Sequence, residues 1–120
     1  MPPLTDPVRC RCYRAALANW RYAGYVNFGK DASRWLGIEL REYTHGQLAQ
    51  LLYEHVWAEA DCRRVDEQRE TRPEWKEHEF HYDLRVRIDG RLVYFETRLI
   101  YRNPNDPDDP LIHVVNAHDA

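Results

Sequence analysis

The last third of the chain alternates between apolar and polar side chains. Between residues 80 and 88 every second residue is apolar: Phe80, Tyr82, Leu84, Val86 and Ile88. This period of two predicts a strand that buries one of its faces. Asp89-Gly90 follows, a pair typical of a two-residue type I′ turn, so a partner strand is expected from Arg91 to Arg102. A third strand is predicted over Leu111–His118.

The turn also predicts the register of this hairpin. If Ile88 pairs with Arg91, then Leu84 lies opposite Phe95. The other pairs on that face are also apolar or nearly so: Val86 with Val93, Tyr82 with Thr97, and Phe80 with Leu99. A slip of one residue would turn these side chains to the other face, so the match supports the hairpin.

The first half of the chain follows a helical period instead. Asp6 and Pro7 suit an N-cap and a first helical residue, and they predict a helix over residues 7–23. Its apolar arc consists of Val8, Cys12, Ala16, Trp20 and Ala23. The opposite arc carries Arg11, Arg14 and Arg21 and could meet phosphate or an acidic partner.

Two more helices are expected before residue 60. Asp31 could cap a short helix that Gly37 would end. Thr44 and Gln47 match a capping box, in which each side chain satisfies an unpaired amide of the first turn. Apolar residues then recur at helical spacing, which predicts a helix over residues 44–59.

Most positions between residues 61 and 77 are charged, which is typical of a solvated helical extension or an exposed arm. The chain is therefore predicted to be one α+β domain over residues 1–120, with N-terminal helices packed on a C-terminal antiparallel sheet of about three strands. Residues 1–5 are expected to form a tail, 6–77 a mainly helical part and 78–120 the sheet. Prolines at 104, 107 and 110 place a loop at 103–110.

Composition narrows the class of protein. The chain has 120 residues, of which 43% are apolar and 31% charged, and its net charge is −3. These values are typical of a globular domain, and the net charge does not favour DNA binding. No apolar run is long enough to span a bilayer, and no secretory leader is recognisable, so no membrane association is expected. Three cysteines in such a chain predict reduced thiols and a cytoplasmic location.

The polar face of the predicted hairpin holds the best candidates for chemistry. The register places Asp83 opposite Glu96, and two facing carboxylates repel each other unless cations neutralise them. The candidates for catalysis are His81, Arg85, Glu96 and Arg98, and those for ligand binding are Asp83 and Tyr94. Such a mesh fits acid–base chemistry or a charged ligand, and it also fits a solvated face held by ion pairs.

No metal site or cofactor is predicted. His78 and His81 have opposite strand parity, as do His113 and His118, so neither pair should share a metal ion. No CxxC, HExxH, phosphate loop or dinucleotide-binding motif is present. The acidic run at 105–109 lacks the ligand spacing of a calcium loop.

Helices followed by a three-stranded antiparallel sheet resemble the small RelE/BrnT-type bacterial toxins. The resemblance covers residues 6–118 in the order of elements and includes no diagnostic motif. It implies an mRNA endonuclease that pairs with an antitoxin and uses the sheet face for cleavage. The matching residue types here are His81, Arg85, Tyr94, Glu96 and Arg98. Such toxins are usually basic, whereas this chain is acidic.

Two functions therefore stay open at this stage. The first is a small cytoplasmic binding domain that docks a partner protein through its charged sheet face or through the basic helix face of Arg11, Arg14 and Arg21. The alternative is a metal-independent endoribonuclease acting on RNA, with His81 or Glu96 as the base. In that mechanism Arg85 or Arg98 would stabilise the charged phosphorane. The sequence predicts no oligomeric state.

Overall fold

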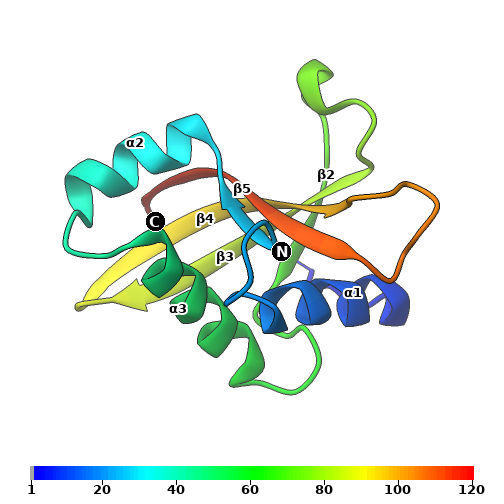
Figure 1. The fold of residues 1–120 in the computed structure, drawn as a ribbon, viewed down its shortest axis with the longest axis horizontal. Coiled ribbons are helices and arrows are strands. Elements are labelled where there is room, and N and C mark those ends of the chain that lie inside the picture. The colour runs from blue at the N-terminus through cyan, green and yellow to red at the C-terminus, as the bar shows by residue number, and fades with distance from the viewer. Residues whose placement is uncertain (1) are drawn as a thin grey trace.

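The computed structural model of the protein describes residues 2–120 and has an α+β fold (Figure 1). Its elements are α1 (Pro7–Ala18), β1 (Val26–Phe28), α2 (Lys30–Glu39), α3 (His45–Trp57), β2 (Asp66–Arg69), the 3-10 turn η1 (Pro73–Trp75), β3 (Phe80–Ile88), β4 (Arg91–Tyr101) and β5 (Pro110–Asp119). The strands form one sheet in the order β1-β5-β4-β3-β2. Only β1 runs parallel to its neighbour, β5. The predicted number of about three strands is wrong, because two short strands extend the sheet at its edges.

The predicted β3–β4 hairpin is confirmed. Ile88 pairs with Arg91 and Leu84 with Phe95, and the same register continues to Tyr82. Asp89 and Gly90 both have positive φ angles, 51° and 79°. A type I′ turn requires that conformation at both central residues, which explains the preference for Asp-Gly.

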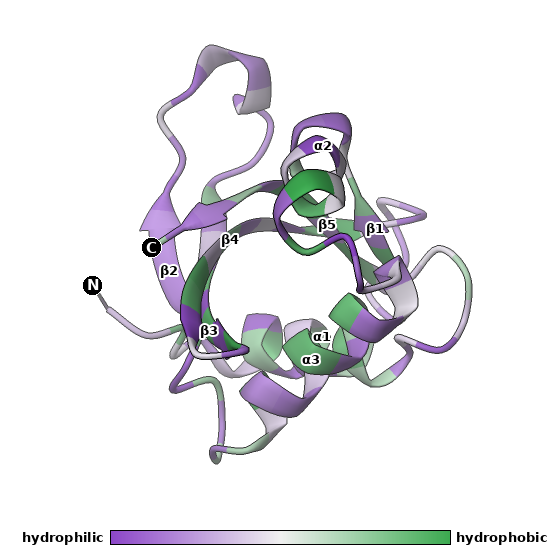
Figure 2. Cartoon of the chain, turned by 90° about the vertical axis from the view of Figure 1, so that its left-hand side faces the viewer, coloured by the Kyte–Doolittle hydropathy of each residue, from purple (hydrophilic) through white to green (hydrophobic). Residues whose placement is uncertain are grey.

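The apolar face of the hairpin lies in a single core. The strands curve around this core, and α1 and α3 close its opposite side (Figure 2). Leu84 and Phe95 have no exposed surface. One buried polar chain crosses the core. Tyr13 Oη lies 2.8 Å from Thr97 Oγ1, which donates to the Tyr82 carbonyl at 2.7 Å. Each buried hydroxyl therefore has a partner, as burial of polar groups requires.

The three predicted helices are present, but some of their boundaries differ from the prediction. The capping box of α3 is confirmed, with Gln47 N 3.1 Å from Thr44 Oγ1 and Thr44 N 2.8 Å from Gln47 Oε1. Helix α1 ends at Ala18 instead of residue 23, because the next amides turn back to carbonyls three residues earlier. Its buried side is also rotated from the predicted arc, so Val8 is 51% exposed.

Helix α2 begins earlier and ends later than predicted. Its N-cap is Gly29, not Asp31, because the Gly29 amide donates to the Val114 carbonyl of β5 at 2.8 Å. Gly37 lies inside the helix instead of ending it. Burial of Leu36 and Leu40 on either side of Gly37 outweighs its intrinsic cost of about 1 kcal/mol in a helix.

The charged segment 61–77 is neither a helical extension nor simply an exposed arm. Four of its residues form the edge strand β2, and η1 lies in the connection to β3. Charged side chains suit an edge strand because they discourage pairing with other chains. The expected tail also makes contacts here. The Leu4 amide donates to the Val65 carbonyl at 2.8 Å, and the Leu4 side chain is buried.

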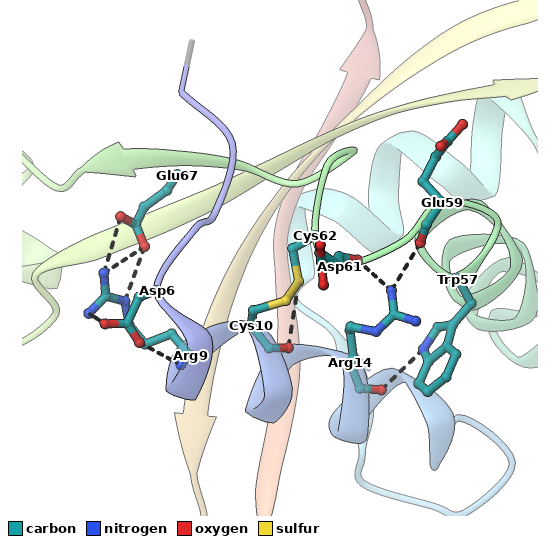
Figure 3. Close-up of a disulfide and its surroundings, with 9 residues drawn as sticks. All are labelled: Asp6, Arg9, Cys10, Arg14, Trp57, Glu59, Asp61, Cys62 and Glu67. Carbon is teal, nitrogen blue, oxygen red and sulfur yellow. Dashed lines mark hydrogen bonds and ion pairs between the residues drawn. A yellow bond between two sulfur atoms is a disulfide. The ribbon is translucent and has the colours of Figure 1, made fainter.

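The prediction of three reduced thiols is wrong. Cys10 and Cys62 form a disulfide, with their Cα atoms 5.8 Å apart (Figure 3). Only Cys12 remains a thiol. Fifty-two positions separate the two bonded residues, so no local motif reveals the pairing. The cytoplasmic prediction rested partly on reduced cysteines and loses that support. Within residues 2–120, none of the helices has the length and apolar character needed to cross a bilayer.

Candidate functional site

Polar side chains fill three cross-strand rows on the sheet surface that faces away from the core. We call this surface the outer face. The pairings place Asn27, His113 and Arg98 in the first row, where His81 and Gln68 also pair with each other. The second row holds Asn116, Glu96, Asp83 and Asp66, and the third holds His118, Tyr94 and Arg85. The predicted site residues of β3 and β4 therefore share one surface.

A β-bulge brings a further histidine to this face. The register between β4 and β5 shifts after Glu96, which pairs with Asn116, while the next residue, Thr97, pairs with Val114. Val115 is the extra residue of β5, so the side-chain alternation changes there. His113 and His118 consequently lie on the same face. The premise that opposite parity places these two histidines on opposite faces is wrong, because it assumed an unbroken strand.

Arg98 is the centre of a buried ion network. Its guanidinium has no exposed surface, and Nη1 lies 2.9 Å from Glu96 Oε2. Arg98 Nη2 also contacts Glu70, and Arg72 contacts the same Glu96 carboxylate from the solvent side. Arg98 Nε is buried without a hydrogen-bond partner among the described residues. The predicted conflict between Asp83 and Glu96 is thus resolved partly by two arginines, one of them outside the hairpin.

The segment from Glu70 to Glu79 covers this network. It leaves the end of β2, passes through η1 and returns to β3 (Figure 1). The ring centroid of Trp75 lies 4.9 Å from Arg98 Cζ and 6.3 Å from the His113 ring. The Trp75 ring stacks on the guanidinium and stabilises its positive charge through a cation–π contact. Trp75 therefore separates Arg98 from solvent.

His81 is held in place by Asp83. His81 Nδ1 lies 3.0 Å from Asp83 Oδ1, and Gln68 Nε2 donates to the other carboxylate oxygen at 3.4 Å. The Asp83 side chain is buried, whereas His81 is 16% exposed. A carboxylate on Nδ1 fixes the ring and leaves Nε2 as the nitrogen available for proton transfer. This is the arrangement of an oriented acid–base histidine.

Burial and charge shift the pKa values of three groups around the network. Burial lowers the pKa of His113 below its usual 6.5, and Arg98 lowers it further, so this ring is neutral at pH 7. Burial opposes ionisation of Glu70, but the Arg72 amide and the Arg98 and Arg72 guanidiniums outweigh it and hold its pKa below 4.5. Burial and Asp83 raise the pKa of Tyr94, which stays protonated.

The remaining predicted residues lie apart from Arg98. Arg85 pairs with Asp66 at 2.9 Å and lies over the Tyr94 ring. Arg11 and Arg14 line a groove beside α1, on the helical side of the sheet. Arg21 stacks on Trp20 instead and does not line that groove. The three arginines of the predicted basic face therefore do not form one site.

Sequence reasoning missed four residues of the site. Glu70, Arg72 and Trp75 come from the charged segment, whose pattern gave no periodicity to place them. His113 was missed because strand parity placed it on the face opposite to His118, and the bulge that changes this leaves no sign in the sequence. The two facing carboxylates, Asp83 and Glu96, were the one available sign that cations must gather at this point of the face.

In the part of the chain that the structure describes, no three His, Cys, Asp or Glu side chains converge as metal ligands. Comparisons with protein-family models, with curated proteins and with solved structures returned no match.

Proposed function

We propose that the outer face is the active site of an endoribonuclease that cleaves RNA by acid–base catalysis. The observation that carries this proposal is the placement of His81 on β3 and His113 on β5, with Arg98 on the strand between them. Neighbouring strands are about 4.8 Å apart, so these two side chains start about 10 Å apart. A phosphodiester bound over Arg98 would lie between the two imidazoles.

The proposed reaction uses the 2′-hydroxyl of RNA as nucleophile. His113 is neutral at pH 7 because its pKa is lowered, so its ring can accept the 2′-hydroxyl proton as the oxygen attacks phosphorus. The P–O5′ bond breaks, and His81, oriented by Asp83, donates a proton to the leaving oxygen. The products are a 2′,3′-cyclic phosphate and a 5′-hydroxyl. Arg98 and Arg72 would stabilise the charge on the phosphorane.

Glu96 has a supporting role in this proposal. The expectation that His81 or Glu96 acts as base is revised, because the Glu96 carboxylate accepts from both Arg98 and Arg72. A carboxylate held by two cations is a poor proton acceptor. Its contribution is to hold the two guanidiniums toward one point.

The buried network itself supports a functional role. Desolvation makes a buried ion network a weak source of stability compared with apolar side chains of the same size. Retaining several charges under Trp75 is therefore better explained by what they bind than by folding. Because Arg98 is covered, RNA must displace Trp75, and the 37% exposed Arg72 would make the first contact with phosphate.

A binding domain without chemistry is the second candidate function. The observation that favours it is the same closed network, in which most of the charged groups already have partners. In that case the outer face would dock a partner without reacting with it.

The test is incubation of the purified protein with fluorescein-labelled RNA in EDTA, with and without ribosomes, followed by analysis of the product ends. We expect cyclic phosphate ends, and a loss of about 10²–10⁴-fold in rate for His81→Ala and for His113→Ala. His118→Ala is the matched control, because this exposed ring lies on the same face but stacks on Tyr94 instead. Circular dichroism checks folding. Absence of cleavage in both settings would overturn the enzyme and favour the binding domain.

A further inference from the structure

A groove lies on the helical side of the molecule and shares no lining residue with the outer face. It has a volume of about 850 Å³ and lies between α1, the N-terminal segment 3–7 and the loop that joins α3 to β2. The buried Leu4 side chain and the Cys10–Cys62 disulfide line it together with Trp57. Figure 3 shows the disulfide and the Trp57 ring. The disulfide fixes two of its three walls relative to each other.

The groove combines an apolar surface with cations. Its apolar lining comes from Pro3, Leu4, Pro7, Ala15, Ala18 and Trp57. Three arginines and one aspartate are the charged lining residues, which gives a local balance of 3 − 1 = +2. The whole chain has a net charge of −3, so the positive groove is a local feature and not a consequence of composition.

The arginines differ in what they already contact. Arg14 donates to the Glu59 carbonyl at 3.2 Å and to the Asp61 carbonyl, and it lies 4.0 Å over the Trp57 ring (Figure 3). Arg14 therefore holds the wall together. Arg11 and Arg63 are exposed, and neither side chain forms an ion pair or hydrogen bond with residues 2–120. Their charges are available to an external anion.

Small side chains line the α1 wall of the groove. Ala15 and Ala18 are exposed on α1 and carry only a methyl group, so another backbone can approach the helix closely. Trp57 is 41% exposed at the end of α3, and large exposed aromatic rings are typical anchors of protein interfaces. Charge alone would also suit RNA, but the apolar lining favours a peptide over a phosphate backbone.

We propose that this groove binds a peptide segment of another protein in which apolar side chains alternate with aspartate or glutamate. The apolar side chains would pack on Ala15, Ala18 and Trp57, and the carboxylates would pair with Arg11 and Arg63. This inference does not depend on the proposed ribonuclease activity, because the two surfaces share no residue.

The probe is a fluorescein-labelled amphipathic peptide of leucine and glutamate, measured by fluorescence anisotropy against the full chain with its disulfide intact. The comparison probes are the same peptide with lysine in place of glutamate, and a single-stranded RNA. We expect saturable binding of the glutamate peptide only. Arg11→Glu with Arg63→Glu should weaken it at least about tenfold, and Ala15→Trp should abolish it by filling the groove.

The matched control is Arg41→Glu, the same charge reversal at an exposed position outside the groove. It should leave the affinity unchanged, and circular dichroism should show all variants folded. Equal binding of the lysine peptide, unchanged affinity of the double variant, preference for RNA, or no saturable binding up to about 1 mM would each overturn the proposal. A dimer in light scattering that Ala15→Trp dissociates would also overturn it, since the occupant would then be a second copy. The double variant should keep any ribonuclease activity.

Discussion

The two faces of the β3–β4 hairpin both contain a buried cross-strand pair, but these pairs are built from opposite chemistry. On the core side, Leu84 and Phe95 pair across the strands and have no exposed surface. On the outer face, Asp83 and Glu96 are the next pair, and both are buried. A buried position in this sheet is therefore not always a hydrophobic position.

The difference lies in what covers each face. Apolar helices cover the core face, and burial of their side chains removes apolar area from water at about 25 cal/mol per Å². A short segment with Glu70, Arg72 and Trp75 covers the outer face and supplies charges of both signs. The core face is stabilised by close packing and by the apolar area that it buries. The outer face is stable only if its buried charges are paired.

The largest effect is expected from breaking the outer network at its centre. Arg98→Gln leaves the Glu70 and Glu96 carboxylates buried without their shared cation, which should cost about 3–5 kcal/mol of unfolding free energy. The sequence alone would suggest that this change leaves folding nearly intact, but that holds only for a solvated face. Urea denaturation measures the loss, and Arg87→Gln at an exposed position is the control.

Removal of the three buried charges of the network sharpens the same comparison. Glu70→Gln, Glu96→Gln and Arg98→Met combined should cost less than Arg98→Gln alone, because the one charge left without these partners, Arg72, is 37% exposed to water. If the triple variant loses as much unfolding free energy as Arg98→Gln or more, the outer face is stabilised by packing, as the core is, and not by the pairing of its charges.

A truncation on the core face should follow simple packing rules. Leu84→Ala is expected to cost about 2–5 kcal/mol, because it removes a fully buried side chain and leaves a cavity. Leu92→Ala, on the outward side of β4 and 37% exposed, should cost much less. Equal losses at the two positions would contradict the assignment of the core to one face.

Acid should weaken the outer face through Glu70. Because the pKa of Glu70 is lowered in the folded state, its ionisation stabilises the fold above pH 4.5, and this contribution disappears as the pH falls through the folded-state value. The urea midpoint should therefore fall more steeply below pH 4.5 in the wild type than in Glu70→Gln. Parallel curves for the two proteins would show that Glu70 has no such role.

The smallest effect is expected at a position that belongs to neither face. Thr44→Ala removes the acceptor for the Gln47 amide at the start of α3 and should cost about 1 kcal/mol. Thr44→Ser, which keeps the hydroxyl, is the control. An unchanged urea midpoint and slope for the alanine variant would mean that the capping box does not contribute.

The sequence by itself determined the local features of this protein. Period-two alternation and Asp89-Gly90 were enough to predict the hairpin and its register, and Thr44 with Gln47 was enough to predict the start of α3. Each of these signals depends on residues close in the chain, because turn conformation, strand parity and helix capping are short-range properties of the backbone.

Only the tertiary structure decided which distant residues complete the site. Glu70 and Arg72 reach the hairpin from the edge-strand connection, and the disulfide joins residues 52 positions apart. His113 reaches the outer face because a bulge in β5 reverses the side-chain alternation before His118. None of these placements leaves a periodic trace in the sequence, since each depends on how separate elements pack together. The sequence could therefore predict that the outer face is polar and that Asp83 lies opposite Glu96, but not that these carboxylates are buried.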